Sequence, residues 1–241
     1  MTGLRDVLST NIAAVTEQIR QACENVDRDP SGLRLVAVTK YAEMDWVHGL
    51  LALGHVRLGE NRPQQLVQRA NEISSAGSVA TESPQWHLIG TLQRNKVRSV
   101  LPFVKMIHSV DSVKLLERID LISSELELTP RVLLEVNISA EASKHGFDPD
   151  GLRNEWDRLQ NCRHVRIEGL MTMAPRVSEP DEARPWFRRL RELRDELRDR
   201  DGGTLPLPEL SMGMSGDFPA AIQEGATLIR IGSRLYEGLH S

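Results

Sequence analysis

The chain has 241 residues, of which 40% are hydrophobic and 27% charged, the balance of a globular protein with one sizeable core. With 30 Lys and Arg against 34 Asp and Glu, its net charge of −4 excludes the basic surface typical of nucleic-acid-binding proteins. The two cysteines, Cys23 and Cys162, lie far apart, which excludes a disulfide framework and a cysteine-rich zinc site.

No apolar run approaches the length that spans a bilayer, and the N-terminus lacks the apolar region of a secretory signal. We therefore expect a cytoplasmic protein that binds neither membrane nor nucleic acid. The first predicted element is an amphipathic helix in residues 3–24. Its apolar residues recur at helical spacing: Leu4, Val7, Leu8, Ile12, Val15 and Ile19.

After this helix, short apolar runs alternate with helical segments. The runs predicted as strands are 33–39, 56–59, 86–90, 106–110, 131–137, 167–173, 209–213 and 227–232. Helices are predicted near 44–53, 62–74, 92–98, 112–124, 149–159, 181–200 and 217–223.

This strand–helix alternation is typical of the α/β class with a parallel sheet. Eight strands in a chain of this length favour a (β/α)8 TIM barrel, whose usual size is about 250 residues. We therefore predict a TIM barrel with an extra N-terminal helix, in a single domain spanning residues 1–241. An open doubly wound sheet is the alternative.

The most charged segment, residues 184–201, carries seven arginines and five acidic residues. Its apolar residues form one predicted stripe, made of Trp186, Leu190, Leu193 and Leu197. The spacing also predicts i,i+4 ion pairs, Arg188 with Glu192 and Arg191 with Asp195. We interpret the segment as a solvated outer helix of the barrel and not as a nucleic-acid-binding helix.

The first predicted strand, "LRLVAVT", is followed directly by Lys40. Strand ends reach the surface, so one interpretation is that this lysine is an ordinary solvent-exposed residue. The alternative is chemical, because a lysine beside a buried sheet can lose its proton and hold a carbonyl compound as a Schiff base. In TIM barrels, ligands bind at the C-terminal ends of the strands, which is where Lys40 lies.

Small residues gather at the ends of the last two strands. "SMGMSGDFPAAI" supplies Gly213, Ser215 and Gly216 before a helix that Asp217 is predicted to cap, and "IRIGSRLYEG" supplies Gly232 and Ser233. These strands form the usual phosphate site of the TIM barrel, where glycine lets backbone N–H groups approach an anion. A glycine-rich turn and an ordinary capped helix are the alternative for the first segment.

Arg230 is unusual because it lies inside the apolar strand "LIRIG". Its guanidinium must either reach the surface or find a partner in the barrel mouth beside the predicted phosphate site. His87 and His108 also fall inside predicted strands and are interpreted as hydrogen-bonded core residues. No H-E-x-x-H, P-loop or G-x-G-x-x-G motif occurs, and we expect no metal site.

Seven segments together resemble the pyridoxal phosphate homeostasis protein family, small relatives of alanine racemase with its fold-type III barrel. They are "AVTK", "LGEN", "WHLIGTLQRNK", "EVNISAEASKHGF", "GLMTMAP", "LSMGMSGD" and "LIRIGSRLYEG", spread over residues 5–239. The resemblance implies that Lys40 holds pyridoxal 5′-phosphate (PLP) as a Schiff base. It also implies that residues 215, 232 and 233 contact the phosphate and that the guanidinium of Arg230 lies near the pyridine nitrogen. The cofactor-binding residues predicted on this basis are Lys40, Asn61, Met214, Ser215, Arg230, Gly232 and Ser233.

The chain departs from the family pattern in two places. Arg62 and Pro63 follow "GEN" where relatives commonly have an aromatic residue and then Val-Gln-Glu, and Thr91 stands where relatives often have histidine. Proline suits the first turn of a helix, so the fold is not affected. The pocket edge formed by residues 62–65 and any role of the missing histidine are left open.

Three functions are compatible with these residues. The resemblance favours a non-enzymatic protein of PLP homeostasis, which binds PLP and passes it to apo-PLP enzymes, and which acts as a monomer. A PLP-dependent amino-acid racemase is the main alternative. A Schiff-base aldolase acting on a sugar phosphate follows from the residues alone.

Overall fold

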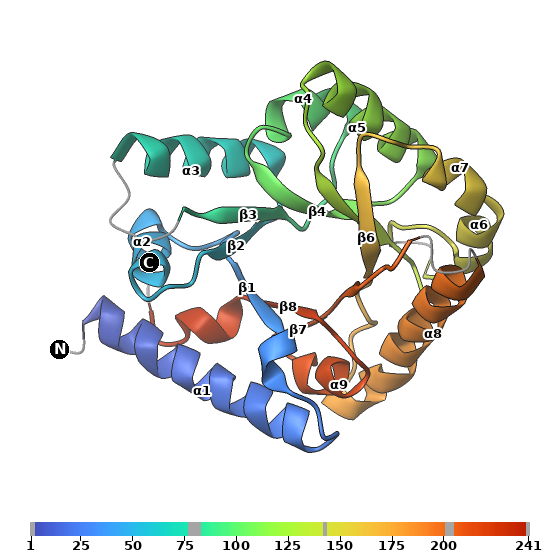
Figure 1. Cartoon of the computed structure of the whole chain (residues 1–241). Helices are drawn as coiled ribbons and strands as arrows, with labels where there is room; N and C mark the ends of the chain where they lie inside the picture. The colour runs from blue at the N-terminus through green and yellow to red at the C-terminus, as the bar shows by residue number, and fades with distance from the viewer. Residues whose placement is uncertain (1–2, 77–82, 142–143, 201–204, 240–241) are drawn as a thin grey trace.

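A computed structural model describes residues 3–76, 83–141, 144–200 and 205–239 of the chain. Eight parallel strands follow one another in chain order around a closed barrel, and the last strand pairs with the first (Figure 1). This closure confirms the TIM barrel and rejects the open sheet. The strands are β1 (Arg34–Val38), β2 (Arg57–Glu60), β3 (Gln85–Leu88), β4 (Val104–Val110), β5 (Arg131–Glu135), β6 (Arg166–Met171), β7 (Glu209–Met214) and β8 (Leu228–Ile231).

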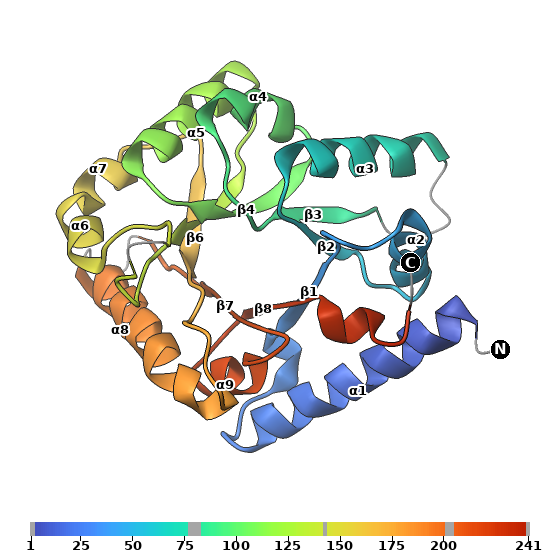
Figure 2. The ribbon, with the colours of Figure 1, turned by 180° about the vertical axis from the view of Figure 1, so that it is seen from behind.

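Helices form a ring outside the strands in both views (Figures 1 and 2). They are α1 (Leu4–Glu24), α2 (Met44–Ala52), α3 (Pro63–Ala76), α4 (Val97–Val100), α5 (Val113–Glu125), α6 (Pro149–Asn154), α7 (Trp156–Gln160), α8 (Arg184–Arg200) and α9 (Phe218–Gln223). Short 3-10 turns are η1 (Pro30–Gly32), η2 (Arg94–Lys96), η3 (Pro180–Ala183) and η4 (Ser233–Tyr236). Within the described residues, no helix has the length and apolar character needed to cross a membrane.

The N-terminal helix α1 has a clear place in this ring. Among the described residues after strand β8, the short turn η4 stands where an outer helix usually follows a barrel strand. Helix α1 packs against α9, η4 and α2 and so covers this part of the barrel (Figure 2). The predicted extra helix therefore completes the outer layer of the barrel.

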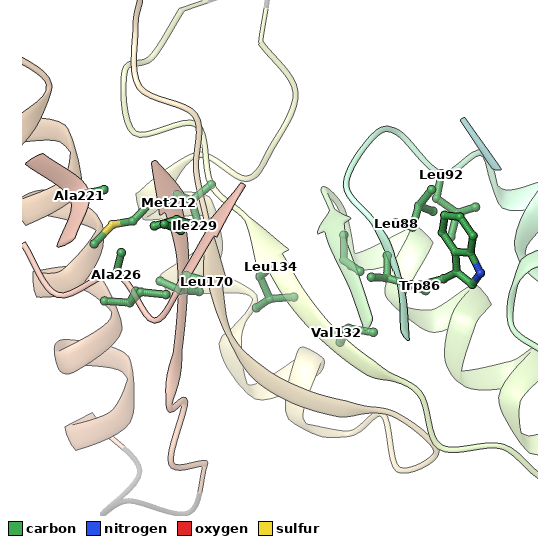
Figure 3. Close-up of a cluster of buried hydrophobic side chains, with 14 of the residues drawn as sticks. Trp86, Leu88, Leu92, Val132, Leu134, Leu170, Met212, Ala221, Ala226 and Ile229 are labelled. Atoms are coloured by element: carbon green, nitrogen blue, oxygen red, sulfur yellow. The ribbon is translucent and has the colours of Figure 1, made fainter. Parts of the chain in front are cut away.

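The main core lies between the strands and the outer helices (Figure 3). Because side chains alternate along a strand, residues such as Leu134 and Ile229 face the helices. Their neighbours Leu133 and Arg230 then face the inside of the barrel. Five buried residues pack together as a second, smaller cluster: Val36, Met106, Leu133, Met171 and Leu228.

Ion pairs cross the N-terminal end of the barrel. Glu209, which is buried, accepts hydrogen bonds from Arg34 and from Thr227 Oγ1, the latter at 2.6 Å. Arg131 lies 2.5 Å from Glu168 and 3.4 Å from Glu209. These groups pair with one another, which leaves the opposite end of the barrel, where the strands finish, for a ligand.

Helix α8 is an outer helix, as predicted, but two details of the prediction were wrong. Phe187 takes the buried place assigned to Trp186, beside Leu190, Leu193 and Leu197. The predicted i,i+4 ion pairs are replaced by contacts with the buried Glu224, which lies within 3.0–3.2 Å of Arg184, Arg188 and Arg191. Glu224 offers a desolvated carboxylate, whereas Glu192 is exposed and Asp195 pairs with Arg194 instead.

Most element boundaries shift by one or two residues from the prediction. The larger difference is the predicted helix 149–159, which is split into α6 and α7 at Glu155. The predicted helix 181–200 likewise begins with the 3-10 turn η3 before α8 starts. Neither change alters the order of strands or the place where they end.

Candidate functional site at the barrel mouth

Lys40 lies in a tight turn directly after β1. The backbone N–H of Ala42 donates to the carbonyl of Thr39 at 2.8 Å, so Lys40 and Tyr41 occupy the two central positions of the turn. The Lys40 side chain is exposed, and its Nζ lies 5.0 Å from the centre of the Tyr41 ring. No described residue forms a hydrogen bond or ion pair with this amine, which is therefore free to react.

The small residues at the ends of β7 and β8 come together as the sequence predicted. The backbone N–H of Gly232 donates to Ser215 Oγ at 3.3 Å, which joins the two strand ends. Ser233 follows at the exposed start of η4. A methyl group on Gly232 would lie 3.3 Å from Cβ of Val38, so the end of β8 also adjoins the strand that leads to Lys40.

Asp217 precedes α9, but its side chain does not cap that helix as predicted. Its Oδ1 instead accepts a hydrogen bond from the backbone N–H of Met214 at 2.6 Å, within a turn closed by Asp217 N–H and Met214 carbonyl. Burial raises the pKa of the Asp217 carboxyl. Asp217 thus fixes the shape of the loop that carries Ser215, and Met214 is left partly exposed at its edge.

Arg230 is buried, so its guanidinium does not leave the core. It donates to Ser211 Oγ, within β7, at 2.5 Å and to the carbonyl of Thr172, which directly follows β6, at 3.0 Å. Burial lowers its pKa to about 10, which still leaves the group charged at neutral pH. Both partners are uncharged, so the guanidinium is not neutralised by a direct carboxylate contact.

A buried chain of polar groups continues from Arg230 across the barrel. Ser211 Oγ lies 2.8 Å from His108 Nδ1, and His108 Nε2 lies 2.8 Å from His87 Nδ1. Burial lowers the pKa of both histidines, that of His87 to about 3, so both rings are neutral. The prediction of both histidines as hydrogen-bonded core residues is confirmed, although His87 Nε2 has no partner within the described part of the chain.

Glu135 is a site residue that the sequence analysis missed. It ends β5 at the barrel mouth, and burial, followed by the nearby charge of Asp111, raises its pKa to about 7. Its predicted strand ran on to Asn137, and nothing local in "LLEVN" marks a perturbed carboxyl. The perturbation depends on burial and on Asp111, which comes from the preceding strand end.

Asn61 follows β2, and its backbone N–H donates to Glu60 Oε1 at 2.8 Å. Its side-chain Oδ1 is buried and has no hydrogen-bond partner within the described part of the chain. Gly90 packs against it so closely that a methyl group there would lie 2.3 Å from the Asn61 carbonyl oxygen. A cavity of about 390 Å³ adjoins this contact. The residues that depart from the family pattern, Arg62, Pro63 and Thr91, all line it.

These residues fit PLP group by group. A free amine suits its aldehyde, and the backbone N–H and hydroxyl groups at the ends of β7 and β8 suit a phosphate. The unpaired Asn61 Oδ1 is the kind of buried acceptor that a polar ligand satisfies. Among the described residues, no group of three or more His, Cys, Asp or Glu side chains could hold a metal ion.

Comparison with known proteins gives one consistent family. The family model described as "Alanine racemase, N-terminal domain" matches residues 10–240. A pyridoxal phosphate homeostasis protein from Aquifex aeolicus is 36% identical over 225 residues, covering 93% of this chain and 95% of that protein. A protein of the same name from Pseudomonas aeruginosa is 36% identical over 230 residues, covering 95% and 94%.

The solved structure of PipY from Synechococcus elongatus with PLP bound superposes with a TM-score of 0.82 at 34% identity. The match covers 95% of this chain and 99% of that one. An alanine racemase from Clostridium difficile has a TM-score of 0.70 at 16% identity and shares the fold alone. The resemblance read from the sequence is confirmed, and the chain belongs to the pyridoxal phosphate homeostasis protein family.

Proposed function

We propose that this protein holds PLP through a covalent link to Lys40 and passes the cofactor to apo-PLP enzymes. The observation that carries the proposal is the free amine at the end of β1, beside the joined ends of β7 and β8. Bound PLP supplies an aldehyde carbon, which forms a double bond to the nitrogen of a primary amine as one molecule of water leaves. The names of the relatives and the PLP bound to PipY support this function.

In this proposal the residues would hold different parts of the cofactor. Ser215, Ser233 and the backbone of Gly232 would donate hydrogen bonds to the phosphate, and Met214 would border it. Asn61 would line the pocket edge, and Arg230 would face the pyridine nitrogen. We also propose a single domain, residues 1–241, supported by the closure of the barrel within one chain, and we propose that it acts as a monomer in the cytoplasm.

The tyrosines argue against a racemase. Racemisation needs two bases on opposite faces of the substrate. Tyr41 is 79% exposed and lies on the same turn as Lys40. Tyr236 stacks on Trp46 with ring centres 5.4 Å apart, and burial raises the pKa of its hydroxyl, so it holds its proton. Neither residue is suited to be the second base.

Arg230 gives a second argument for a carrier. A guanidinium is a donor without an acceptor, so a pyridine nitrogen facing it stays unprotonated. An unprotonated ring is a weaker electron sink for the carbanion that amino-acid chemistry requires. The hydroxyl oxygen of Ser211 and the carbonyl oxygen of Thr172 both accept hydrogen bonds from Arg230, so neither partner withdraws its charge.

The test combines PLP transfer with amino-acid turnover. PLP-loaded protein, mixed with an apo-PLP enzyme, is expected to restore that enzyme's activity while alanine and serine are not racemised at a measurable rate. Racemisation at about 1 s⁻¹ or faster, an ordinary enzymatic rate, would contradict the carrier function. A yellow, borohydride-reducible chromophore in the purified protein would reject a cofactor-free aldolase.

The phosphate contacts can be tested with Ser215→Ala. Loss of a hydroxyl hydrogen bond to a charged group costs about 1.5–3 kcal/mol, so the affinity for PLP should fall roughly ten- to a hundredfold. The affinity for unphosphorylated pyridoxal should hardly change. Ser74→Ala is the control, because the Ser74 hydroxyl donates only to the carbonyl of Ala70 within α3. Equal losses for both ligands would contradict the assigned contact.

A further inference from the structure

A buried arginine of α3 holds the backbone on both sides of Lys40. Arg69 is 6% exposed, and its Nη1 donates to the carbonyl of Thr39 at 2.6 Å. Its Nη2 donates to the carbonyl of Ala42, also at 2.6 Å. The two carbonyls lie at the first and last positions of the turn that carries Lys40. The fork of one guanidinium therefore spans this turn.

The charge of Arg69 is balanced within the same cluster. Glu60, which is completely buried, lies 3.2 Å from Arg69 Nη1 and accepts a hydrogen bond from Thr39 Oγ1 at 3.3 Å. The other oxygen of Glu60 accepts from the backbone N–H of Asn61. One buried ion pair thus links the end of β1, where Lys40 lies, to the end of β2, where Asn61 lies.

Placing such a pair in the interior is costly. Two desolvated charges add little net stability, and apolar residues of similar volume often serve as well. What arginine offers the turn is a planar group whose N–H donors bind two carbonyls at once. The Lys40 side chain itself has no described hydrogen-bond partner, so its starting point is fixed only through the backbone.

We propose that Arg69 is a positioning residue for Lys40, and that with Glu60 it holds the amine where it meets the cofactor aldehyde. This inference rests on the proposed function. Arg69 touches neither reacting group and acts through the turn at residues 39–42. A fixed backbone lowers the entropy lost when the amine reacts, and small displacements of reacting groups are costly.

The test compares covalent capture with non-covalent binding. Pyridoxine 5′-phosphate has an alcohol in place of the aldehyde, so it binds without using the Lys40 amine. In Arg69→Lys, the ammonium lacks the planar fork that spans both carbonyls, and the rate of borohydride-trappable PLP capture should fall at least about tenfold. The affinity for pyridoxine 5′-phosphate should change by less than about threefold. The visible absorption band of the linked form should also shift.

A matched control is Arg194→Gln, since Arg194 also donates to a loop carbonyl, that of Leu207 at 3.2 Å, but contacts no part of the turn at residues 39–42. It should capture PLP at the wild-type rate. Arg69→Gln removes the positive charge beside Glu60, whereas Arg69→Lys keeps it. If Arg69→Gln does not fold, Arg69→Lys alone decides whether Arg69 positions Lys40.

The outcomes separate the two proposals. If the wild-type protein forms no link at Lys40, the proposed function fails whatever Arg69 does. If the wild type forms the link and Arg69→Lys captures PLP equally fast, the positioning role is wrong. Equal losses of capture and of pyridoxine 5′-phosphate binding would also overturn it, because Arg69 would then only support the fold.

Discussion

Lys40→Ala is expected to abolish the borohydride-reducible chromophore and to leave the barrel folded. The amine is the reacting group in the proposed link, so nothing replaces it when the side chain ends at Cβ. The free energy of unfolding should change by less than about 0.5 kcal/mol, because Lys40 is exposed and packs on little besides Tyr41. Absorbance, thermal unfolding and the mass of the reduced, digested protein measure these effects.

Lys105→Ala is the matched control, since Lys105 is also exposed but lies near the start of β4, at the other end of the barrel. Its chromophore and its PLP transfer should equal those of the wild type. In Lys40→Ala, PLP should still bind weakly through the groups that contact its phosphate. If the reduced and digested wild-type protein carried the pyridoxyl mass on a peptide that does not contain Lys40, the assignment of Lys40 as the linked residue would be wrong.

The order and number of the strands could be predicted because each strand is an apolar run that is distinct from its neighbours. "LRLVAVT" and "RVLLEVN" are typical of strands buried on both faces, and the long α8 carries a helical stripe. The contact between the last two strand ends, through Ser215 and Gly232, also followed from the predicted fold, and the phosphate contacts there stay predictions. Local composition was sufficient for these features.

The features that were missed are those with partners distant in sequence. From the sequence, Arg69 is one more polar residue of an amphipathic helix, yet its partners lie in the turn after β1 and at the end of β2. Glu224 collects arginines from α8, which lie 33 to 40 positions before it. The hydrogen bond between Ser211 and His108 joins residues 103 positions apart. No local pattern encodes such pairs, because burial creates them only when the barrel closes.

Gly169 was also missed, although it lies in the segment "GLMTMAP". Strand β6 pairs with β7 here, and Gly169 lies opposite Glu209. A methyl group on Gly169 would lie 1.8 Å from the carbonyl oxygen of Glu209, a backbone atom that cannot turn aside. The close approach also lies near the site, since Thr172, three residues after Gly169, and Ser211, two residues after Glu209, are the two partners of Arg230.

Gly169→Ala is therefore expected to have the largest effect on stability. The collision is with backbone, so one strand must move, and the loss should exceed about 3 kcal/mol, at the upper end for single substitutions. For a chain of this size that lowers the midpoint of thermal unfolding by roughly 6–12 °C. The fraction of Gly169→Ala that still folds should bind PLP more weakly, because Thr172 and Ser211 are displaced from their positions beside Arg230.

Gly32→Ala is the control for this substitution. A methyl group on Gly32 meets no atom within 4 Å, so its free energy of unfolding should stay within about 0.5 kcal/mol of the wild type. Unfolding in urea and PLP titration measure both variants. If Gly169→Ala unfolded like Gly32→Ala and bound PLP normally, β6 and β7 would not need this close approach. The convergence of Thr172 and Ser211 on Arg230 would then have to depend on other contacts.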